Sequence, residues 1–392
     1  MDIADPTVPL PPPPPGAGAP GGPPGPLDLP ADGEDGQPRR RWSRRATWLS
    51  AFAGVVVVGL VLVGLFLKLP YYLLSPGSVR DANQYISIEG AETYPDQGGT
   101  IDYLTVSIRQ ATPLELVAAW IDPAVEVVDE DLILGGQTPS ENRQFNLQLM
   151  ADSKDSATYQ ALNRLGYEIP MSGTGAVIAA VQEGLPAASV LAPGDVVVSA
   201  DGQPISLNQD LITAVRTHAP GDVMVLGIQA FEGGETRTVE VELAARPDDP
   251  AVAMLGVSTL TRDLTFDFPV TVTIDSGRVG GPSAGLAFTL GILDAMTPES
   301  LTGGLRVATT GTMGLDGTVG QVGGVHQKVV AADRAGVDLM LVPAAEIDEA
   351  RRHAGDLRVE PVEDLDDALA VLATVGGGDA VLPPPTTVAA PS

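Results

Sequence analysis

A long apolar stretch near the N-terminus is the strongest hydrophobic pattern in the chain. From Thr47 to Leu67 the sequence TWLSAFAGVVVVGLVLVGLFL contains no charged residue over 21 positions. As a helix this stretch would be about 31 Å long, enough to cross a hydrocarbon core of about 30 Å. We therefore expect a transmembrane helix over residues 47–69.

The charges on either side of this stretch predict its orientation. Its N-terminal flank carries a cluster of arginines: Arg39, Arg40, Arg41, Arg44 and Arg45. Only Lys68 and Arg80 follow shortly after it, so the positive-inside rule places the N-terminus in the cytoplasm. A cleaved signal peptide is the alternative, but it would need a shorter apolar core and an A-x-A-like cleavage site. We expect an uncleaved, single-pass anchor in the cell membrane, with the remainder of the chain on the extracytoplasmic side.

Both ends of the chain are rich in proline and glycine and cannot bury a core. Residues 1–46, which include the basic flank, are predicted to be a disordered cytoplasmic tail. Its polyproline run could serve as a plain spacer or bind an adaptor. Residues 374–392 are predicted to be a second disordered tail.

Residues 75–165 show mixed periodicities. IDYLTVSIRQ (101–110) has the pattern of a strand, PLELVAAWI (113–121) that of a short helix, and residues 140–166 that of a longer helix with a polar face. No motif in this region carries chemistry. We interpret it as a mixed α/β connecting region with a structural role.

Residues 166–248 follow a different order of elements. A short apolar strand (175–181) precedes turn signals at 193–195 and 201–202, then a helix over 206–218 and a hairpin around residues 232–235. This order resembles a PDZ domain of the bacterial protease type, which implies peptide binding by strand addition beside a helix. The resemblance implies a carboxylate-binding loop near MSGTGAV (171–177). A small β-rich packing domain without a ligand is the alternative.

Residues 252–373 alternate strands and helices. A strand is predicted over 269–275 and another over 339–343, with helices over 284–296, 325–336 and 362–375. Such alternation is typical of a layered α/β domain. The fold class expected for the whole chain is therefore α+β and multidomain, with one transmembrane helix, a PDZ-like β-rich domain and a C-terminal α/β domain.

Composition excludes several kinds of function. The net charge of −28 repels nucleic acid, so no nucleic-acid partner is expected. The chain has no cysteine, which rules out a thiol nucleophile, thiolate metal sites and disulfides. Its three histidines are widely scattered, so we expect no metal site and no cofactor.

Lys328 lies on an apolar face of its predicted helix. The positions three, four and seven residues away on that face are Val325, Ala331, Ala332 and Ala335. Only three of the chain's 22 basic residues are lysines, so a lysine here suggests a need that arginine cannot meet, namely the loss of a proton. A buried lysine can act as a general base. A lysine whose stem merely covers apolar surface is the alternative.

GGPSAGLAF (280–288) places Ser283 where a helix begins. Glycines allow close backbone approach, proline suits a helix start, and the first N–H groups of a helix lack internal partners. Ser283 could be only a helix start. With Lys328 as its base, it could instead be a nucleophile, with free N–H groups holding the oxyanion. The backbone loop expected to form that oxyanion site contains Gly281, Pro282 and Ala284.

Three segments resemble the proteolytic domain of the Lon proteases: GGPSAG (280–285), TTGTMGLDGTVGQVGGVHQKVVAADRAG (309–336) and LMLVP (339–343). The resemblance implies that Ser283 is the nucleophile, Lys328 its base and Thr310 a supporting side chain. Two positions depart from the family pattern: Thr312 and Gly280 stand where acidic residues are common. Together with the anchor and the PDZ-like region, the chain is similar to the membrane-anchored Lon-like proteases with a PDZ domain in Gram-positive bacteria. This similarity implies a homo-oligomer.

The sequence contains no GxxxxGK[ST] motif, so we expect no ATP-driven step. The predicted function is a membrane-anchored, ATP-independent serine endopeptidase with a Ser–Lys dyad, acting on protein or peptide substrates such as loops, tails or unfolded segments. The PDZ-like domain would engage substrate or partner. One alternative is a catalytically inert PDZ scaffold at the membrane. Another is a small-molecule kinase in which the 280–285 loop cradles phosphate.

Overall fold

The computed structural model describes residues 44–94 and 98–377. The chain divides into two compact units, residues 1–60 and 61–392. The tail predicted over 1–46 lies outside the described residues as far as residue 43. The tail predicted over 374–392 lies outside them from residue 378.

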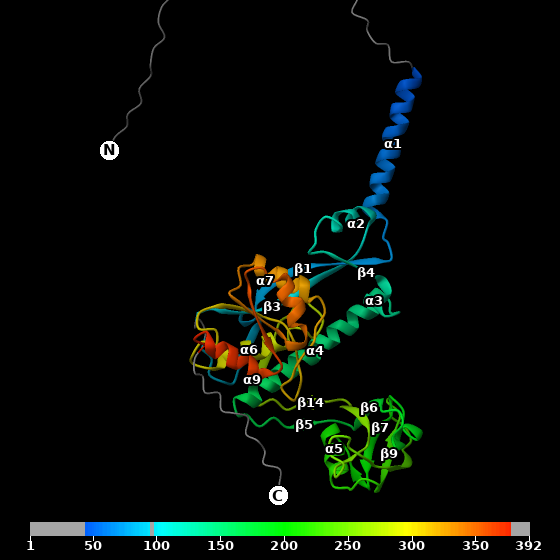
Figure 1. The fold of residues 1–392 in the computed structure, drawn as a ribbon, viewed down its shortest axis with the longest axis vertical. Helices are drawn as coiled ribbons and strands as arrows, with labels where there is room; N and C mark the ends of the chain where they lie inside the picture. Colours follow the sequence, from blue (N-terminus) through cyan, green and yellow to red (C-terminus); the bar gives the residue numbers. More distant parts are fainter. Residues whose placement is uncertain (1–43, 95–97, 378–392) are drawn as a thin grey trace, which may run out of the picture. The chain divides into compact units, whose positions relative to one another are not determined.

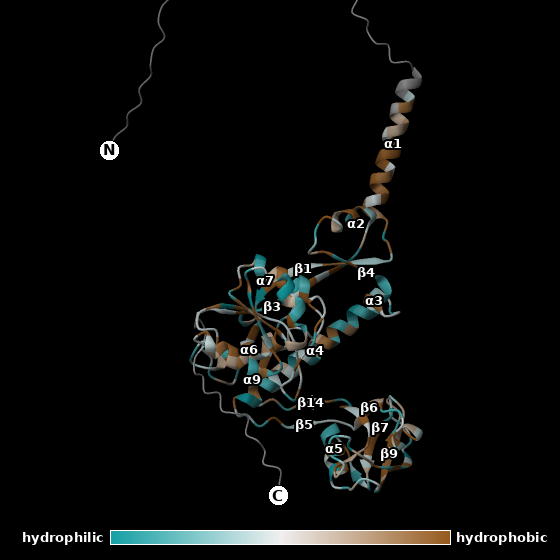
Figure 2. Cartoon of the chain, viewed as in Figure 1, coloured by the Kyte–Doolittle hydropathy of each residue, from teal (hydrophilic) through white to brown (hydrophobic). Residues whose placement is uncertain are grey.

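Helix α1 (Arg44–Phe66) covers most of the predicted membrane span. Much of the helix is coloured as hydrophobic in Figure 2. Its large apolar side chains are exposed, with Trp48 at 76% and Phe66 at 74%. The side chains of residues 44–47 and 50 lie outside the described set. Among the helices in the described part of the chain, none has the combined length and apolarity that crossing a membrane requires.

The larger domain of the second unit is built on a six-stranded sheet (Figure 1). In spatial order its strands are β20 (Arg358–Val362), β19 (Leu339–Pro343), β16 (Arg306–Thr309), β3 (Thr100–Gln110), β1 (Tyr71–Asp81) and β4 (Glu126–Asp129). The first four run parallel, and β1 pairs antiparallel with both β3 and β4. The sheet is therefore mixed, with its parallel half formed mainly by the C-terminal part of the chain.

Alternate residues of these strands pack on opposite faces of the sheet, as the two-residue period of a strand requires. In β19, Leu339 and Leu341 join the core beneath helices α6 (Gly285–Met296) and α9 (Leu365–Thr374). Met340 and Val342 join a second core, beneath helices α7 and α8. α7 spans Val325–Arg334 and α8 spans Ile347–His353. The domain thus has three layers, α/β/α.

The region expected to be a connector is part of this three-layered domain. β1 and β3 complete its sheet, and α4 (Pro139–Arg164) packs along α6. Ala157 and Ala161 of α4 are fully buried in the same core as Phe288 of α6. The proteolytic fold expected over 252–373 therefore also uses residues from 71 to 164.

The smaller domain is a β-rich unit whose sheet has the order β10–β9–β7–β6–β13. These strands span Arg237–Glu242, Val223–Gln229, Val196–Ala200, Ala176–Val181 and Val257–Thr261, and β8 (Gln203–Pro204) pairs with β7. Helix α5 (Asn208–Arg216) packs its buried Leu211 and Val215 against the sheet. The sequence predicts that this domain ends at residue 248, but β13 pairs with β6, so the sheet extends to residue 261.

The smaller domain is inserted into the larger one. The chain leaves along β5 (Met171–Ser172) and returns along β14 (Thr265–Phe266), and these two strands pair antiparallel. Phe266 contacts Tyr159 of α4, with ring centroids 5.4 Å apart. The paired segments form a two-stranded stalk between the two domains.

The remaining described elements are short. Three more pairs of strands are β2 (Ile86–Glu89) with β15 (Thr271–Ile274), β11 (Ala244–Ala245) with β12 (Ala253–Met254), and β17 (Thr312–Met313) with β18 (Val319–Gly320). The short helices are η1 (Ala82–Tyr85), α2 (Pro113–Ala119), α3 (Glu130–Leu134), η2 (Pro186–Ser189) and η3 (Ala344–Glu346).

Candidate active site

Helix α4 holds the loop that carries Ser283. The backbone N–H of Gly281 donates to the carbonyl of Asn146 at 2.8 Å, and the Ser153 hydroxyl donates to the carbonyl of Pro282 at 3.0 Å. Gly281 has a φ of +90°, a conformation that glycine adopts without strain. The loop is therefore fixed by the α4 backbone and a side chain from the region that we expected to be purely structural.

The segment that follows β16 holds Ser283 from another side. The N–H of Gly311 donates to the carbonyl of Ser283 at 3.0 Å, and the N–H of Leu286 donates to the carbonyl of Gly311 at 3.2 Å. The N–H of Thr310 in turn donates to the carbonyl of Leu341 in β19 at 3.1 Å. The backbone of Ser283 is thus connected to the central sheet immediately before α6 begins.

The amine of Lys328 is buried where α7 meets this segment. Its side chain is 2% exposed, and its Nζ donates to the Thr310 Oγ1 at 3.0 Å. The Thr310 hydroxyl donates to the carbonyl of Ser283 at 3.3 Å. Three residues singled out in the sequence, from three separate segments, therefore meet at one place.

Burial lowers the pKa of Lys328 from 10.5 to about 8, because an ammonium group loses its hydration there. The negative charge of Glu346 acts in the opposite direction and raises it. Glu346 itself accepts a hydrogen bond from the N–H of Val322 at 3.1 Å, in the loop before α7. With a pKa of about 8, roughly one Lys328 amine in ten is neutral at pH 7.

Ser283 and Lys328 line the same cavity, of about 710 Å³. Among the described residues, no hydrogen bond joins the Ser283 hydroxyl to the Lys328 amine, which bonds to Thr310 instead. Catalytic hydrogen bonds often shorten only when substrate is bound. The Ser283 hydroxyl and the Lys328 amine therefore line one cavity but are not hydrogen-bonded to each other.

The loop residues expected at the oxyanion site have different roles. The N–H of Gly281 is already bonded to Asn146, and Pro282 has no N–H, so neither can donate to an oxyanion. Within the described residues, the N–H groups of Ser283 and Ala284 donate to no backbone carbonyl. These two donors, at the start of α6, are free to bind an anion.

The residues that form the far wall of the cavity carry no motif from which a functional site could be predicted. That wall comes from β1, β3, α3 and α4. On α4, Asn142, Asn146 and Met150 all line it, and their spacing of four residues puts them on one face of the helix. This periodicity was visible in the sequence, but no chemical motif accompanied it.

The described lining of the cavity has no carboxylate that could ligate a metal ion. Over residues 44–94 and 98–377, no group of three or more His, Asp or Glu side chains is placed to hold a metal ion. The described residues that line the cavity include neither Asp nor Glu. A magnesium–nucleotide complex, the ligand of the kinase alternative, would find no carboxylate there.

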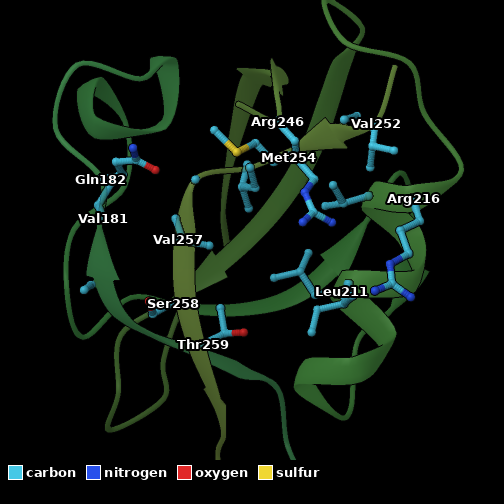
Figure 3. A pocket seen from close by; sticks show the side chains of 16 residues that line it. Val181, Gln182, Leu211, Arg216, Arg246, Val252, Met254, Val257, Ser258 and Thr259 are labelled. Carbon is cyan, nitrogen blue, oxygen red and sulfur yellow. The ribbon is translucent and has the colours of Figure 1, made fainter. Parts of the chain in front are cut away.

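A second cavity, of about 450 Å³, lies in the smaller domain between β13 and α5 (Figure 3). Leu211 of α5 and Val257 of β13 are on its two walls, and Arg216 and Arg246 add guanidinium groups to its lining. A cavity of this size, apolar with a few charged groups, is typical of a ligand site.

This second cavity is not where we expected the carboxylate-binding loop. Residues 171–177 are not among the described residues that line it, whereas residues 252–259 form one side. Gly256, in this segment, has a φ of +74° and approaches Leu185 so closely that a Cβ would clash. Leu-Gly-Val at 255–257 falls within the range predicted for the next domain, 252–373.

Comparison with known families identifies both domains of the second unit. Residues 260–374 match the Lon protease (S16) C-terminal proteolytic domain, and residues 163–243 match the PDZ domain. The chain therefore combines a Lon-type α/β proteolytic domain with a β-rich PDZ domain. This confirms the two resemblances in the sequence and supports a serine protease.

Two curated relatives each match about a third of this chain or less. The Lon protease of Clostridioides difficile (strain 630) is 37% identical over 106 residues, covering 26% of this chain and 13% of its own length. The Lon protease of Methylocella silvestris is 34% identical over 141 residues, which cover 35% of this chain and 17% of that protein. The chain thus spans less than a fifth of the length of these relatives. Among solved structures, the PDZ domain of an SdrC-like protein from Listeria monocytogenes is 22% identical, with a TM-score of 0.20. The match covers 22% of this chain and 87% of that structure.

Because the Lys328 amine is buried, we expect the free energy of unfolding to depend on pH. The pKa of Lys328 is about 8 in the folded chain and 10.5 ordinarily, so between these pH values the unfolded chain binds more protons than the folded chain. The free energy of unfolding therefore rises with pH across that window. Below pH 8 the buried ammonium lowers the free energy of unfolding by its full amount. In a Ser283→Ala background, Lys328→Met should therefore raise the free energy of unfolding at pH 7 by up to about 3 kcal/mol, with a smaller gain at pH 10.

Urea denaturation at the two pH values measures this difference. Arg351→Met, which removes an exposed positive charge from α8, is the control and should show no such pH-dependent gain. An equal effect of Lys328→Met at both pH values would show that the amine is not penalised by burial.

Proposed function

We propose that this protein is an ATP-independent serine endopeptidase that uses Ser283 as nucleophile and Lys328 as general base. The observation that carries the proposal is the buried Lys328 amine, linked through Thr310 to the backbone of Ser283 on a shared cavity. The match to the Lon-type proteolytic domain supports the same class of reaction.

In the proposed acylation step, neutral Lys328 takes the proton of the Ser283 hydroxyl as its oxygen attacks a peptide carbonyl carbon. Because the amine donates to Thr310, its lone pair is left to accept that proton. The N–H groups of Ser283 and Ala284 stabilise the oxyanion. The Lys328 ammonium then protonates the leaving amine, and the C–N bond breaks.

Deacylation repeats these roles with water. Neutral Lys328 takes a proton from the attacking water, and the ammonium returns it to the Ser283 oxygen as the acyl group leaves. The absence of an ATPase motif from the printed sequence indicates substrates that need no unfolding, such as loops, tails and already unfolded segments.

Removing either member of the dyad should abolish proteolysis. Ser283→Ala lacks the nucleophile, and Lys328→Arg keeps a guanidinium that cannot lose its proton, so each should lower kcat/KM on an unfolded protein substrate by about 10³-fold or more. Lys154→Arg, on α4 and outside the cavity lining, should retain activity. In the parent, kcat/KM should rise about tenfold per pH unit up to about pH 8 and then level off, as Lys328 becomes neutral.

A fluorophosphonate probe separates this proposal from the inert scaffold. It should label Ser283 in the parent and leave the Ser283→Ala protein unlabelled. Full activity in either dyad variant, or no labelling of a folded parent, would contradict the proposed mechanism.

We further propose that the PDZ domain binds an extended peptide of substrate or partner in the cavity between β13 and α5. A strand added beside β13 would place alternate side chains towards the apolar wall that Leu211 helps to form. Arg216 at the cavity can interact with a peptide carboxylate, whereas Arg246 already pairs with Asp248 at 2.6 Å.

Ile212→Asp tests this site, because Ile212 lines the cavity and a carboxylate there disfavours an apolar side chain. In Ser283→Ala protein, it should weaken binding of peptides from a C-terminal library at least tenfold, measured by fluorescence anisotropy. Thr213→Asp, the next residue and outside the cavity lining, is the matched control. Equal binding by both variants, or no binding by the parent, would refute a peptide site here.

We also propose that residues 47–67 anchor the chain in the cell membrane, with both domains on the extracytoplasmic side. The uncharged stretch and its arginine flank support this placement. Because the chain has no cysteine, single introduced thiols report topology cleanly. A membrane-impermeant maleimide should label Glu232→Cys in intact cells and Gln37→Cys only after lysis.

Alkaline carbonate provides the matching extraction test. The full chain should stay with the membrane, and a chain lacking residues 47–67 should be released. Extraction of the full chain, or the reverse labelling pattern, would overturn the anchor.

A further inference from the structure

Two arginines flank the cavity that contains Ser283. Arg278 lies five residues before Ser283 in the same loop, and Arg143 lies on the first turns of α4. Both line the cavity, and both side chains are exposed. Asn146, one turn after Arg143, accepts the hydrogen bond from Gly281, so each arginine is on an element that is held directly against the nucleophile's loop.

Neither guanidinium has a partner within the described part of the chain. Arg109, Arg237 and Arg306 each form an ion pair with a carboxylate, at 2.9, 2.6 and 2.6 Å. No ion pair or side-chain hydrogen bond involves Arg143 or Arg278 among the described residues. Both cations are therefore available to a ligand.

The charge of the cavity is opposite to that of the protein. The chain has 50 acidic and 22 basic residues, yet the described lining of the cavity has no Asp or Glu and contains Arg143, Arg278 and Lys328. A cleft of one charge sign concentrates its field and raises the local concentration of oppositely charged ligands. The cleft can therefore attract acidic segments that the net negative charge of the chain repels.

Arginine is also suited to recognise the carboxylate of a peptide side chain. Its planar guanidinium can donate two parallel hydrogen bonds to one carboxylate, which fixes position as well as charge. At an exposed site, one arginine–carboxylate pair contributes only a modest free energy of binding. The pair still distinguishes a carboxylate from the corresponding neutral amide.

We propose that the cleft selects peptide segments that carry Asp or Glu within a few residues of the bond to be cut, with the carboxylates pairing with Arg278 and Arg143. This inference rests on the proposed peptidase function and names its substrate class. Neutral segments remain substrates of the same dyad, and basic segments are disfavoured.

Matched internally quenched peptides test the selection by cleavage. The full chain, purified in mild detergent, is assayed on peptides that differ only by Glu, Gln or Lys on either side of the scissile bond. Each Glu should raise kcat/KM about three- to tenfold over Gln, and added salt should reduce the difference. Arg143→Gln and Arg278→Gln should each remove part of this preference, and the double variant most of it.

Charge reversal and a matched control sharpen the result. Arg278→Glu should turn the preference towards the Lys peptide. Arg351→Gln changes the net charge equally, but it lies on α8 and outside the described cavity lining, so it should leave the preference unchanged. A Glu preference that persists in the double arginine variant, or equal rates for all peptides in the parent, would overturn the proposal.

A binding measurement separates this inference from the proposed function. Ser283→Ala protein is titrated with the same sequences carrying a neutral dye and an amidated C-terminus, which removes the terminal carboxylate that a PDZ site could bind. Tighter binding of the Glu peptide, lost on changing both arginines, would support the cleft even if no peptide were cut. If peptides are cut without charge preference and bind equally, the inference fails while the peptidase proposal stands.

Discussion

The Lys328 amine lies buried between α7 and the segment after β16, where the Thr310 hydroxyl accepts its hydrogen bond. Taking an ammonium group out of water is costly, and one neutral hydroxyl compensates only in part. This loss of hydration free energy is avoided when the amine gives up its proton. A neutral amine is also the form that can act as a base. The surrounding domain leaves Lys328 only 2% exposed, although it lines the same cavity as Ser283.

Two parts of the chain that are distant in sequence satisfy this requirement together. The segments around β16, α6 and α7 contain Thr310, Ser283 and Lys328, but β1 and β3 complete the sheet beneath them, and α4 fixes the loop of Ser283 through Asn146 and Ser153. The family match begins at residue 260, so it includes these three residues and leaves out the strands and the helix that hold them in place. Residues 71–164 are therefore as necessary to the cavity as the motif residues themselves.

The sequence predicted local elements better than their assembly. Strong periodicity and helix-start signals placed α4, α6, α7 and β19 within a few residues of where they lie. The burial of Lys328 followed from the apolar residues three and four positions away. Strand pairing between distant segments leaves no such local mark, so the place of β1 and β3 in the sheet was not visible. β1 also contains Pro76 and Gly77, and its irregular register there obscures the pattern of a strand.

The same limit explains why the walls of both cavities were not predicted. Arg143 and Arg278 resemble ordinary exposed charges until the fold places them beside one cavity. Leu-Gly-Val at 255–257 could begin a new domain or end the previous one, and only the pairing of β13 with β6 decides between them.

The stalk attaches the inserted domain at two points of the chain that are adjacent in space. Met171 and Ser172 lie directly opposite Phe266 and Thr265, so the chain enters and leaves the insertion at neighbouring points. Antiparallel residues that face each other are only about 5 Å apart, a gap that a two-residue Asn-Gly turn closes naturally. Replacing residues 173–264 by such a turn would leave a continuous hairpin at the edge of the proteolytic domain. Recognition and cleavage could then be studied, or recombined with other binding modules, as separate parts.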